Sequence, residues 1–276
     1  MKAAYYAFLL RQGLVEFSKG LPYSRCAEYP AVVEKLALTP DDHLLDVGSR
    51  YSPLPQVLAL RYGCKVTAVD PEPNFRERQL KMARRVPAAR RLVDAGKLDF
   101  HVADAGTLAM PDGTFSKVSC ISVLEHIVDE TVVVRELGRV LAPTGRLVLS
   151  VPYDPWRDQP KYYRTNAYVT HESNETFYMR YYNDENLVDR LVVPSGLKLL
   201  YRETFGEPGF NAHNLLFGND TIPWYVRRAC IQPLAPLAAS LFIRKMEARE
   251  FRRKVKMYTA DTALLVLGHT SAVWHG

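Results

Sequence analysis

The feature that most constrains the fold is the alternation of short apolar runs with longer helical segments between His43 and Pro152. Five runs have the length and composition of strands, and they are HLLDV, KVTAVD, LDFHVAD, KVSCISV and GRLVLSVP. Three segments between them have helical character, and they are PLPQVLALRY, opening at Pro53, NFRERQLKMARR, and DETVVVRELGRVLAP, with Asp129 as its N-cap. This alternation predicts βαβ units, a parallel sheet and helices on both of its faces.

Acidic residues end the first three predicted strands, at Asp46, Asp70 and Asp104, and Gly48 follows the first strand directly. Parallel strands place their carboxyl ends along one edge, where ligands bind. Carboxylates can accept hydrogen bonds from ribose hydroxyls and from the adenine amino group, and a glycine lets the backbone approach a ligand closely. A single aspartate here also fits a turn or a helix cap, but three in register predict a site for an adenosine-containing ligand.

These motifs resemble those of the class I S-adenosylmethionine-dependent methyltransferases, in their small-molecule branch. LLDVGSRYSPLP is similar to the first motif of the family, TAVDP to the end of its second strand, and VADAGTLAMPDGTF to its adenine-contacting loop. ISVLEHIVD and ELGRVLAPTGRLVLSVP are similar to the segments that form its fourth and fifth strands. The resemblance covers about residues 25–153 and, more weakly, the late strand pair LKLLYRETF and TALLVLGHT.

The resemblance implies a Rossmann-like α/β fold with a mostly parallel seven-stranded sheet, flanked by helices and carrying an insertion between its last two strands. It also implies S-adenosyl-L-methionine as cofactor and no metal. The ribose hydroxyls would be bound by Asp70, and the adenine edge by Asp104. The residues expected to contact the cofactor are Asp46, Gly48, Ser49, Arg50, Asp70, Pro71, Asp104, Ala105, Ser122, Val123 and Leu124.

The chain departs from the family pattern in the loop after the first strand. Arg50 and Ser52 stand where the family has its second and third glycines. Two interpretations of Arg50 remain open, because its side chain can pair with the methionine carboxylate or point to solvent. A dinucleotide-dependent dehydrogenase is the nearest alternative, and Asp70 has the spacing that it requires. That class also requires G-x-G-x-x-G, whereas Gly48 is the only glycine in this loop.

Three residues are candidates for catalysis of proton transfer from a hydroxyl acceptor. Glu125 and His126 follow the fourth strand, and His171, next to Glu172, lies in a segment rich in aromatic residues. Structural roles are the alternative, with Glu125 ordering the loop, His126 packing at a helix start and His171 lying at the surface.

The acceptor is expected to be a small molecule, with O-methylation of a hydroxyl on a lipid-like, polyketide or sugar-bearing natural product. The signatures of amino-directed nucleic-acid methyltransferases and of enzymes that attack pyrimidine carbon are absent from the sequence, so base methylation is disfavoured.

Residues 153–182 contain nine aromatic residues, which form either a wall for the acceptor or a small core of their own. The other functional hypotheses are a degenerate methyltransferase fold that acts as a scaffold and an RNA methyltransferase.

Four parts of the chain are expected. A helical cover at the N-terminus would include Arg25, Glu28 and Tyr29, and a helix over DENLVDRLVVPSG would end at Gly196. The four parts are residues 1–40 as the cover, 41–210 as the methyltransferase core with an aromatic-rich lid at 153–183, 211–257 as a helical insertion, and 258–276 with the final strand.

Positive charge is concentrated in the insertion. Residues 222–256 contain nine Lys and Arg against two Asp and Glu, a net charge of +7, while the whole chain carries +6. An apolar run from Ile231 to Ile243, broken by Pro233 and Pro236, lies between the basic clusters and is too short to span a bilayer. Three interpretations remain open: peripheral contact with a membrane or lipid substrate, packed helices or a homodimer contact, and nucleic-acid binding, which is the least favoured.

The expected compartment is the cytoplasm, with a peripheral membrane location as the alternative. The four cysteines are far apart in sequence, without CxxC or zinc-ligand spacing, and are expected to be reduced thiols. The N-terminal apolar run lacks the cleavage site of a signal peptide.

Overall fold

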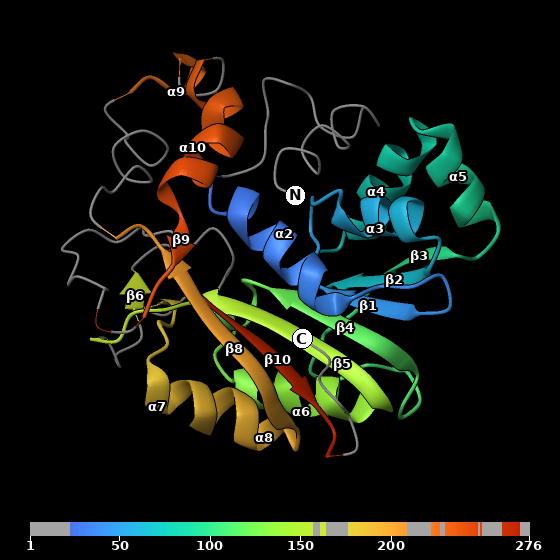
Figure 1. Ribbon diagram of the computed structural model, residues 1–276. Helices are drawn as coiled ribbons and strands as arrows, with labels where there is room; N and C mark the ends of the chain where they lie inside the picture. Colours follow the sequence, from blue (N-terminus) through green and yellow to red (C-terminus); the bar gives the residue numbers. More distant parts are fainter. Residues whose placement is uncertain are drawn as a thin grey trace.

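The computed structural model describes most of the chain between Tyr23 and Thr270. It covers residues 23–156, 161–163, 176–208, 222–226, 230–247, 249 and 261–270. Within these residues the chain forms one eight-stranded sheet with helices on both faces, together with a separate two-stranded sheet (Figure 1). The expected Rossmann-like α/β architecture is confirmed.

Five parallel strands form the part of the sheet that was predicted most directly, and their order is β3-β2-β1-β4-β5. Because β1 lies between β2 and β4, the chain reverses direction across the sheet at this point, as it does at the ligand-binding edge of open α/β sheets. The strands are β1 (His43–Val47), β2 (Lys65–Asp70), β3 (Leu98–Val102), β4 (Phe115–Ile121) and β5 (Leu141–Pro152).

The sheet continues with antiparallel strands at its other end. β10 (Thr262–Gly268) lies between β5 and β8 (Lys198–Gly206), and it is antiparallel to both. The predicted count of seven strands is one too few, because β9 (Arg244–Lys245) adds an eighth. This two-residue strand comes from the insertion, and it pairs with the last two residues of β8. β6 (Lys161–Tyr163) and β7 (Thr176–Met179) form the separate sheet.

Each face of the sheet is covered by its own set of helices (Figure 1). On one face lie α2 (Arg25–Leu36), α3 (Leu54–Tyr62), α4 (Phe75–Arg84), α5 (Pro87–Asp94) and α10 (Ala235–Phe242). On the other face lie α6 (Glu130–Val140), α7 (Asp184–Leu187), the π-helix η2 (Val188–Val192) and α8 (Val193–Ser195).

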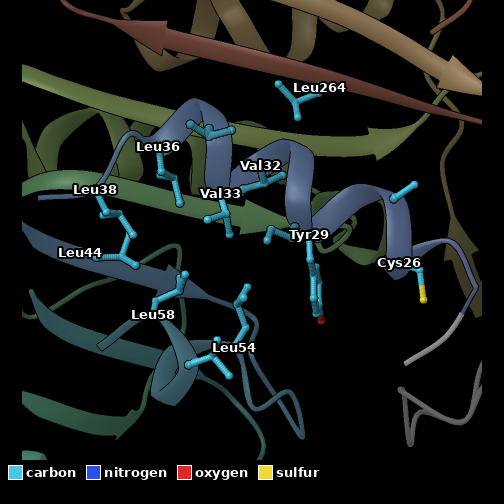
Figure 2. Close-up of a cluster of buried hydrophobic side chains, with 14 of the residues drawn as sticks. Cys26, Tyr29, Val32, Val33, Leu36, Leu38, Leu44, Leu54, Leu58 and Leu264 are labelled. Carbon is cyan, nitrogen blue, oxygen red and sulfur yellow. The ribbon is translucent and has the colours of Figure 1, made fainter. Parts of the chain in front are cut away.

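Alternation along the strands divides the core into two layers. In β1, Leu44 belongs to the layer beneath α2 and α3, whereas Leu45 belongs to the layer on the α6 face. Figure 2 shows α2 lying over the sheet, with Val33 and Leu36 directed toward Leu44. Both side chains are nearly or fully buried, and this packing holds the N-terminal helix across the strands.

The boundaries of one predicted helix differ in detail from the structure, and the end of another agrees with it. α6 begins after Asp129, but the Asp129 carboxylate accepts a hydrogen bond from the Thr131 hydroxyl and makes no side-chain cap to the backbone. The helix ends at Val140, and the following Leu-Ala-Pro, which was assigned to the helix, already belongs to β5. The helical segment from Asp184 ends at Gly196 as predicted.

Two prolines that were expected to break one helix instead each lie in the first turn of a separate helix. Pro233 lies in the first turn of the short 3-10 helix η5 (Gln232–Leu234), and Pro236 lies in the first turn of α10. Proline is favoured there because its missing N–H has no helical partner to lose.

Part of the aromatic-rich segment packs in the core. Tyr153 and Tyr182 are fully buried on the α6 face, and the Tyr153 hydroxyl donates a hydrogen bond of 2.6 Å to Asp184. For these two residues the structure favours a core role, while Trp156 is exposed. The side chains of Tyr162, Tyr163 and Tyr168 lie outside the described residues.

Candidate functional site

A buried carboxylate supports the loop that follows β1. Asp46 is 3% exposed and lies one residue before the end of the strand. It accepts hydrogen bonds from the Ser119 hydroxyl of β4 at 2.5 Å and from the Ser49 hydroxyl at 2.6 Å. Burial raises the pKa of Asp46 to about 6, against the lowering effect of both hydroxyls, and the nearby Asp70 also raises it. Asp46 therefore ties the beginning of the loop to β4.

Gly48 forms the turn at the carboxyl end of β1. Its φ of +76° is in the left-handed region, and its N–H donates to the Val69 carbonyl at 2.9 Å. A Cβ at this position would lie 2.2 Å from Cγ2 of Val123. The loop after β1 and the segment after β4 therefore meet at a place where only glycine fits.

Arg50 has a left-handed backbone conformation, with a φ of +40°. Its N–H donates to Asp70 at 2.9 Å, so the backbone turns toward the tip of β2. Its guanidinium lies 4.8 Å from the ring centroid of Tyr51, and one nitrogen is 3.9 Å from the Glu72 carboxylate. The side chain is thus partly exposed and directed toward Tyr51 and Glu72, the latter just beyond β2.

Asp70 ends β2 as predicted and is 6% exposed. One of its oxygens accepts from the N–H of Arg50, and the other accepts from the N–H of Glu72 at 3.0 Å. A carboxylate offers about four lone-pair positions, so these two bonds leave acceptor capacity for two more donors. Pro71 follows directly and is exposed.

A buried glutamine on α4 holds the same loop from outside, and the sequence analysis did not identify it. Gln79 is fully buried, and its side-chain amide donates to the carbonyls of Arg50 and Ser52 at 3.1 and 2.9 Å. Its spacing could have revealed it, because Gln79 stands between the buried Phe75 and Ala83 on one helix face. A polar residue on an otherwise apolar face needs a partner, and here the loop provides it.

The loop after β3 lies beside the tip of β2, because the Ala103 N–H donates to the Asp70 carbonyl at 3.1 Å. Asp104 is exposed, and its carboxylate accepts from the N–H of Gly106 at 2.8 Å. Ala105 is buried. The structure therefore places the predicted adenine-contacting residues next to the predicted ribose-binding residue.

The end of β4 has unusual backbone geometry. Ser122 has a φ of +47°, and its N–H donates to the Ser150 carbonyl of β5 at 2.9 Å. Val123 packs against Gly48, whereas the side chain of Leu124 is fully buried in the core. Of the three residues predicted to line the base of the site, Leu124 directs its side chain into the core.

Glu125 and His126 lie in the short 3-10 helix η1 (Leu124–His126), directly beyond this turn. Glu125 is 3% exposed, and burial raises its pKa to about 8 in spite of the nearby Arg25. Its Oε2 has no hydrogen-bond partner among the described residues, and its Oε1 lies 3.9 Å from Nε2 of His126. The imidazole is about one-third exposed, so the pair combines a buried acid with an accessible base. The third catalytic candidate, His171, lies outside the described residues, as does Glu172.

Helix α2 connects the two sides of this edge. Glu28 is 1% exposed, and its Oε1 accepts 2.6 Å hydrogen bonds from the hydroxyls of Ser122 and Ser150. Its other oxygen pairs with Arg25. One residue further, the Tyr29 hydroxyl donates to Ser52 Oγ at 3.0 Å, in the loop after β1. The predicted N-terminal cover is therefore bonded to the β1 loop and to the end of β4, although the sequence did not indicate the serine partners.

This edge of the sheet combines three chemical features. Acceptors suited to a nucleoside lie at the tips of β2 and β3, a turn that only glycine can form follows β1, and an acid beside an imidazole follows β4. Such an arrangement can bind a nucleoside-containing ligand across β1–β3 and act on a proton beyond β4.

Comparison with protein families agrees with this geometry, because residues 45–149 match the model of a methyltransferase domain. Among curated proteins, a ubiquinone biosynthesis O-methyltransferase of Xanthomonas oryzae pv. oryzae is 35% identical over 108 residues, which cover 39% of this chain and 41% of the relative. An O-methyltransferase of Pyrenophora dematioidea is 29% identical over 119 residues, covering 43% of this chain and 42% of the relative. The chain thus spans about two fifths of the length of these relatives.

Solved structures show the same fold at low identity. A SAM-dependent methyltransferase from Methanosarcina mazei superposes with a TM-score of 0.56 at 17% identity, covering 87% of this chain and 97% of that one. Geranyl diphosphate C-methyltransferase from Streptomyces coelicolor gives 0.55 at 12%, covering 88% and 78%. The [4+2]-cyclase SpnF gives 0.55 at 18%, covering 89% and 82%, so the fold also occurs in a protein named for another reaction.

Proposed function

We propose that this chain, whose residues 45–149 match the model of a methyltransferase domain and whose fold is that of a solved SAM-dependent methyltransferase, is an S-adenosylmethionine-dependent methyltransferase acting on a small molecule. The observation that carries the proposal is the Asp70 carboxylate, which is buried at the tip of β2 beside the Gly48 turn and keeps acceptor capacity. The S-adenosylmethionine would supply the electrophilic methyl group.

The residues at the edge fit the adenosine part of this cofactor. Both Asp70 oxygens are oriented by backbone N–H groups, which fixes the carboxylate and leaves positions for the two ribose hydroxyls. Asp104 and Ala105 follow on the neighbouring loop, where an adenine ring bonded to that ribose would extend. The methionine part would then approach the backbone at Gly48 and Ser49, beneath which Asp46 is buried.

Proton removal from the acceptor is assigned to His126. A hydroxyl acceptor must lose its proton as the new O–CH₃ bond forms, and the imidazole is an accessible basic group beyond β4. Glu125, whose pKa is raised to about 8 by burial, largely keeps its own proton at neutral pH. It is therefore assigned to positioning the turn, while His126 accepts the proton and returns it to solvent.

We propose a hydroxyl on a lipid-like, polyketide or sugar-bearing molecule as the acceptor. The support is that two relatives carry the name O-methyltransferase, one of them in ubiquinone biosynthesis, while a structural neighbour is named for methylation of geranyl diphosphate. A cytoplasmic location, with peripheral contact to a membrane, is the matching proposal for where the chain acts. A homodimer formed through residues 222–256 is the alternative to this membrane contact.

Label transfer tests the proposal. The protein is incubated with S-[methyl-¹⁴C]adenosylmethionine and a panel of alkylated catechols, hydroxylated polyketides and glycosides, and label is counted in the extracted acceptor. We expect transfer to at least one hydroxylated acceptor and a fall in kcat of about 100-fold or more in His126→Gln. Binding of the cofactor without transfer to any member of the panel would contradict O-methylation of these acceptor classes.

A second candidate function is that of a scaffold with a degenerate site. The observation that favours it is Arg50, a left-handed arginine at a glycine position of the cofactor loop. Absence of any cofactor binding by the native protein would favour this alternative over the enzyme.

A further inference from the structure

Helix α10 is apolar on two sides, and among the described residues one side is buried while the other is exposed. Ala235, Ala238 and Ala239 are buried in the layer that includes α2. Figure 1 shows α10 beside α2, near the end of the sheet that carries β9. Alanine side chains are short, so the two helices can approach closely, and α10 and α2 are in contact.

Three leucines lie on the exposed side of the same segment, and they are called the leucine stripe below. Leu234, Leu237 and Leu241 are 56%, 60% and 69% exposed. Their spacing of three and four residues places them in one row along the helix. No charged residue occurs from residue 229 to residue 243, so nothing in the sequence makes this row hydrophilic.

Positive charge follows the leucine stripe directly. Arg244 and Lys245 follow the helix after Ile243 and are exposed, and the Lys245 ammonium lies 2.5 Å from the Glu203 carboxylate. The surrounding residues 222–256 carry a net charge of +7, whereas the rest of the chain nets −1. An apolar row within a strongly basic part of the chain is complementary to a surface that is apolar inside and anionic outside.

We infer that the leucine stripe docks on the surface of an anionic lipid bilayer, with α10 lying in the interface. No helix among the residues that the structure describes has the length and apolarity to cross a membrane. The leucines enter the boundary between headgroups and acyl chains, and the flanking lysines and arginines contact anionic headgroups. This inference goes beyond methyl transfer, and either can fail without the other.

Vesicle sedimentation tests the inference. The full chain is centrifuged with phosphatidylcholine vesicles and with vesicles of phosphatidylcholine and phosphatidylglycerol at about 70:30. We expect the native protein to pellet with the anionic vesicles and to be released by salt. The variant Leu234→Gln/Leu237→Gln/Leu241→Gln should bind at least tenfold more weakly.

A matched control places the same change on the other face of the sheet. Val188 and Val193 are exposed apolar residues of η2 and α8, so Val188→Gln/Val193→Gln should bind vesicles as the native protein does. Circular dichroism and S-adenosylhomocysteine affinity are measured on each variant. The single variant Leu241→Gln is used if the triple variant does not fold.

Three results would overturn the inference. They are a native protein that stays in the supernatant with both kinds of vesicle, a stripe variant that pellets equally well, and a native dimer in light scattering that the stripe variant converts to a monomer without any lipid binding. The last result would mean that the leucine stripe binds a second copy of the chain instead of a lipid surface.

Discussion

The Glu28 carboxylate accepts a 2.6 Å hydrogen bond from the Ser122 hydroxyl, and this contact joins helix α2 to the end of β4. The two residues are 94 positions apart in the chain. Ser122 immediately precedes the segment that contains Glu125 and His126, so the N-terminal helix takes part in positioning the proposed catalytic end of the site. Because Tyr29 of the same helix bonds to Ser52, the proposed cofactor loop is held by it as well.

Replacing Glu28 should destabilise the fold strongly. Glu28→Ala leaves Arg25, the buried Ser150 hydroxyl and the partly buried Ser122 hydroxyl without this acceptor, and we expect the free energy of unfolding to fall by about 3 kcal/mol. Urea denaturation measures the change. The exposed Glu34 on the same helix is the control, and Glu34→Ala should alter stability by less than about 0.5 kcal/mol. Equal effects of the two substitutions would contradict the role assigned to Glu28.

Stability should depend on pH through Glu125. Its pKa is raised from 4.5 to about 8 in the folded protein. The contribution of the protonated Glu125 carboxyl to the free energy of unfolding is therefore fully present below about pH 4.5, and it is lost as the pH rises toward 8. Glu125→Gln stays neutral, so its stability relative to the native protein should increase over this range, by at most about 1.4 kcal/mol per pH unit. Asp46 shifts in the same direction but only to about 6, so measurements between pH 6.5 and 8 isolate Glu125. A constant difference across this range would rule out the raised pKa.

The Gly48 turn should not tolerate a side chain. Gly48→Ala adds a Cβ that would lie 2.2 Å from Val123, and we expect a loss of about 2–4 kcal/mol from overpacking together with the left-handed backbone. Gly63 has a similar φ of +70° with open space around its Cβ position, so Gly63→Ala should cost only about 1 kcal/mol. Thermal unfolding compares the two variants. Partial rescue of Gly48→Ala by Val123→Ala would identify the contact, and equal losses at Gly48 and Gly63 would exclude it.

Arg50 should be replaceable by glycine. Arg50→Gly relieves a left-handed backbone and removes an exposed ion pair, so we expect stability to rise by up to about 1 kcal/mol. Because the guanidinium is directed toward Tyr51 and Glu72, affinity for S-adenosylhomocysteine should change less than threefold. A loss of tenfold or more in Arg50→Gly, restored in Arg50→Lys, would show instead that the side chain binds the methionine carboxylate.

The sequence predicted the parts of the site that depend on local pattern. Asp46, Asp70 and Asp104 could be placed at one edge because strand periodicity and βαβ connectivity determine where parallel strands end. Glu125 and His126 followed from their position just after the fourth strand. All of these are near neighbours of a strand end in the chain, so no long-range contact had to be known.

The parts that depend on distant contacts could not be predicted. The serine partners of Glu28 lie 94 and 122 residues away, and hydroxyls on strands carry no pattern that names their acceptor. Gln79 bonds to a loop 27 and 29 residues earlier. The eighth strand consists of two basic residues. Its pairing depends on where the chain emerges from α10, beside the end of β8, rather than on β propensity.

The most direct test of the account is calorimetric titration of the protein with S-adenosylhomocysteine. The account predicts micromolar binding that weakens at least tenfold in Asp70→Ala and is unchanged in Asp94→Ala, which removes an exposed carboxylate outside the site. Absence of binding to the native protein, or equal affinity of the two variants, would contradict the claim that the tip of β2 holds the ribose of the cofactor.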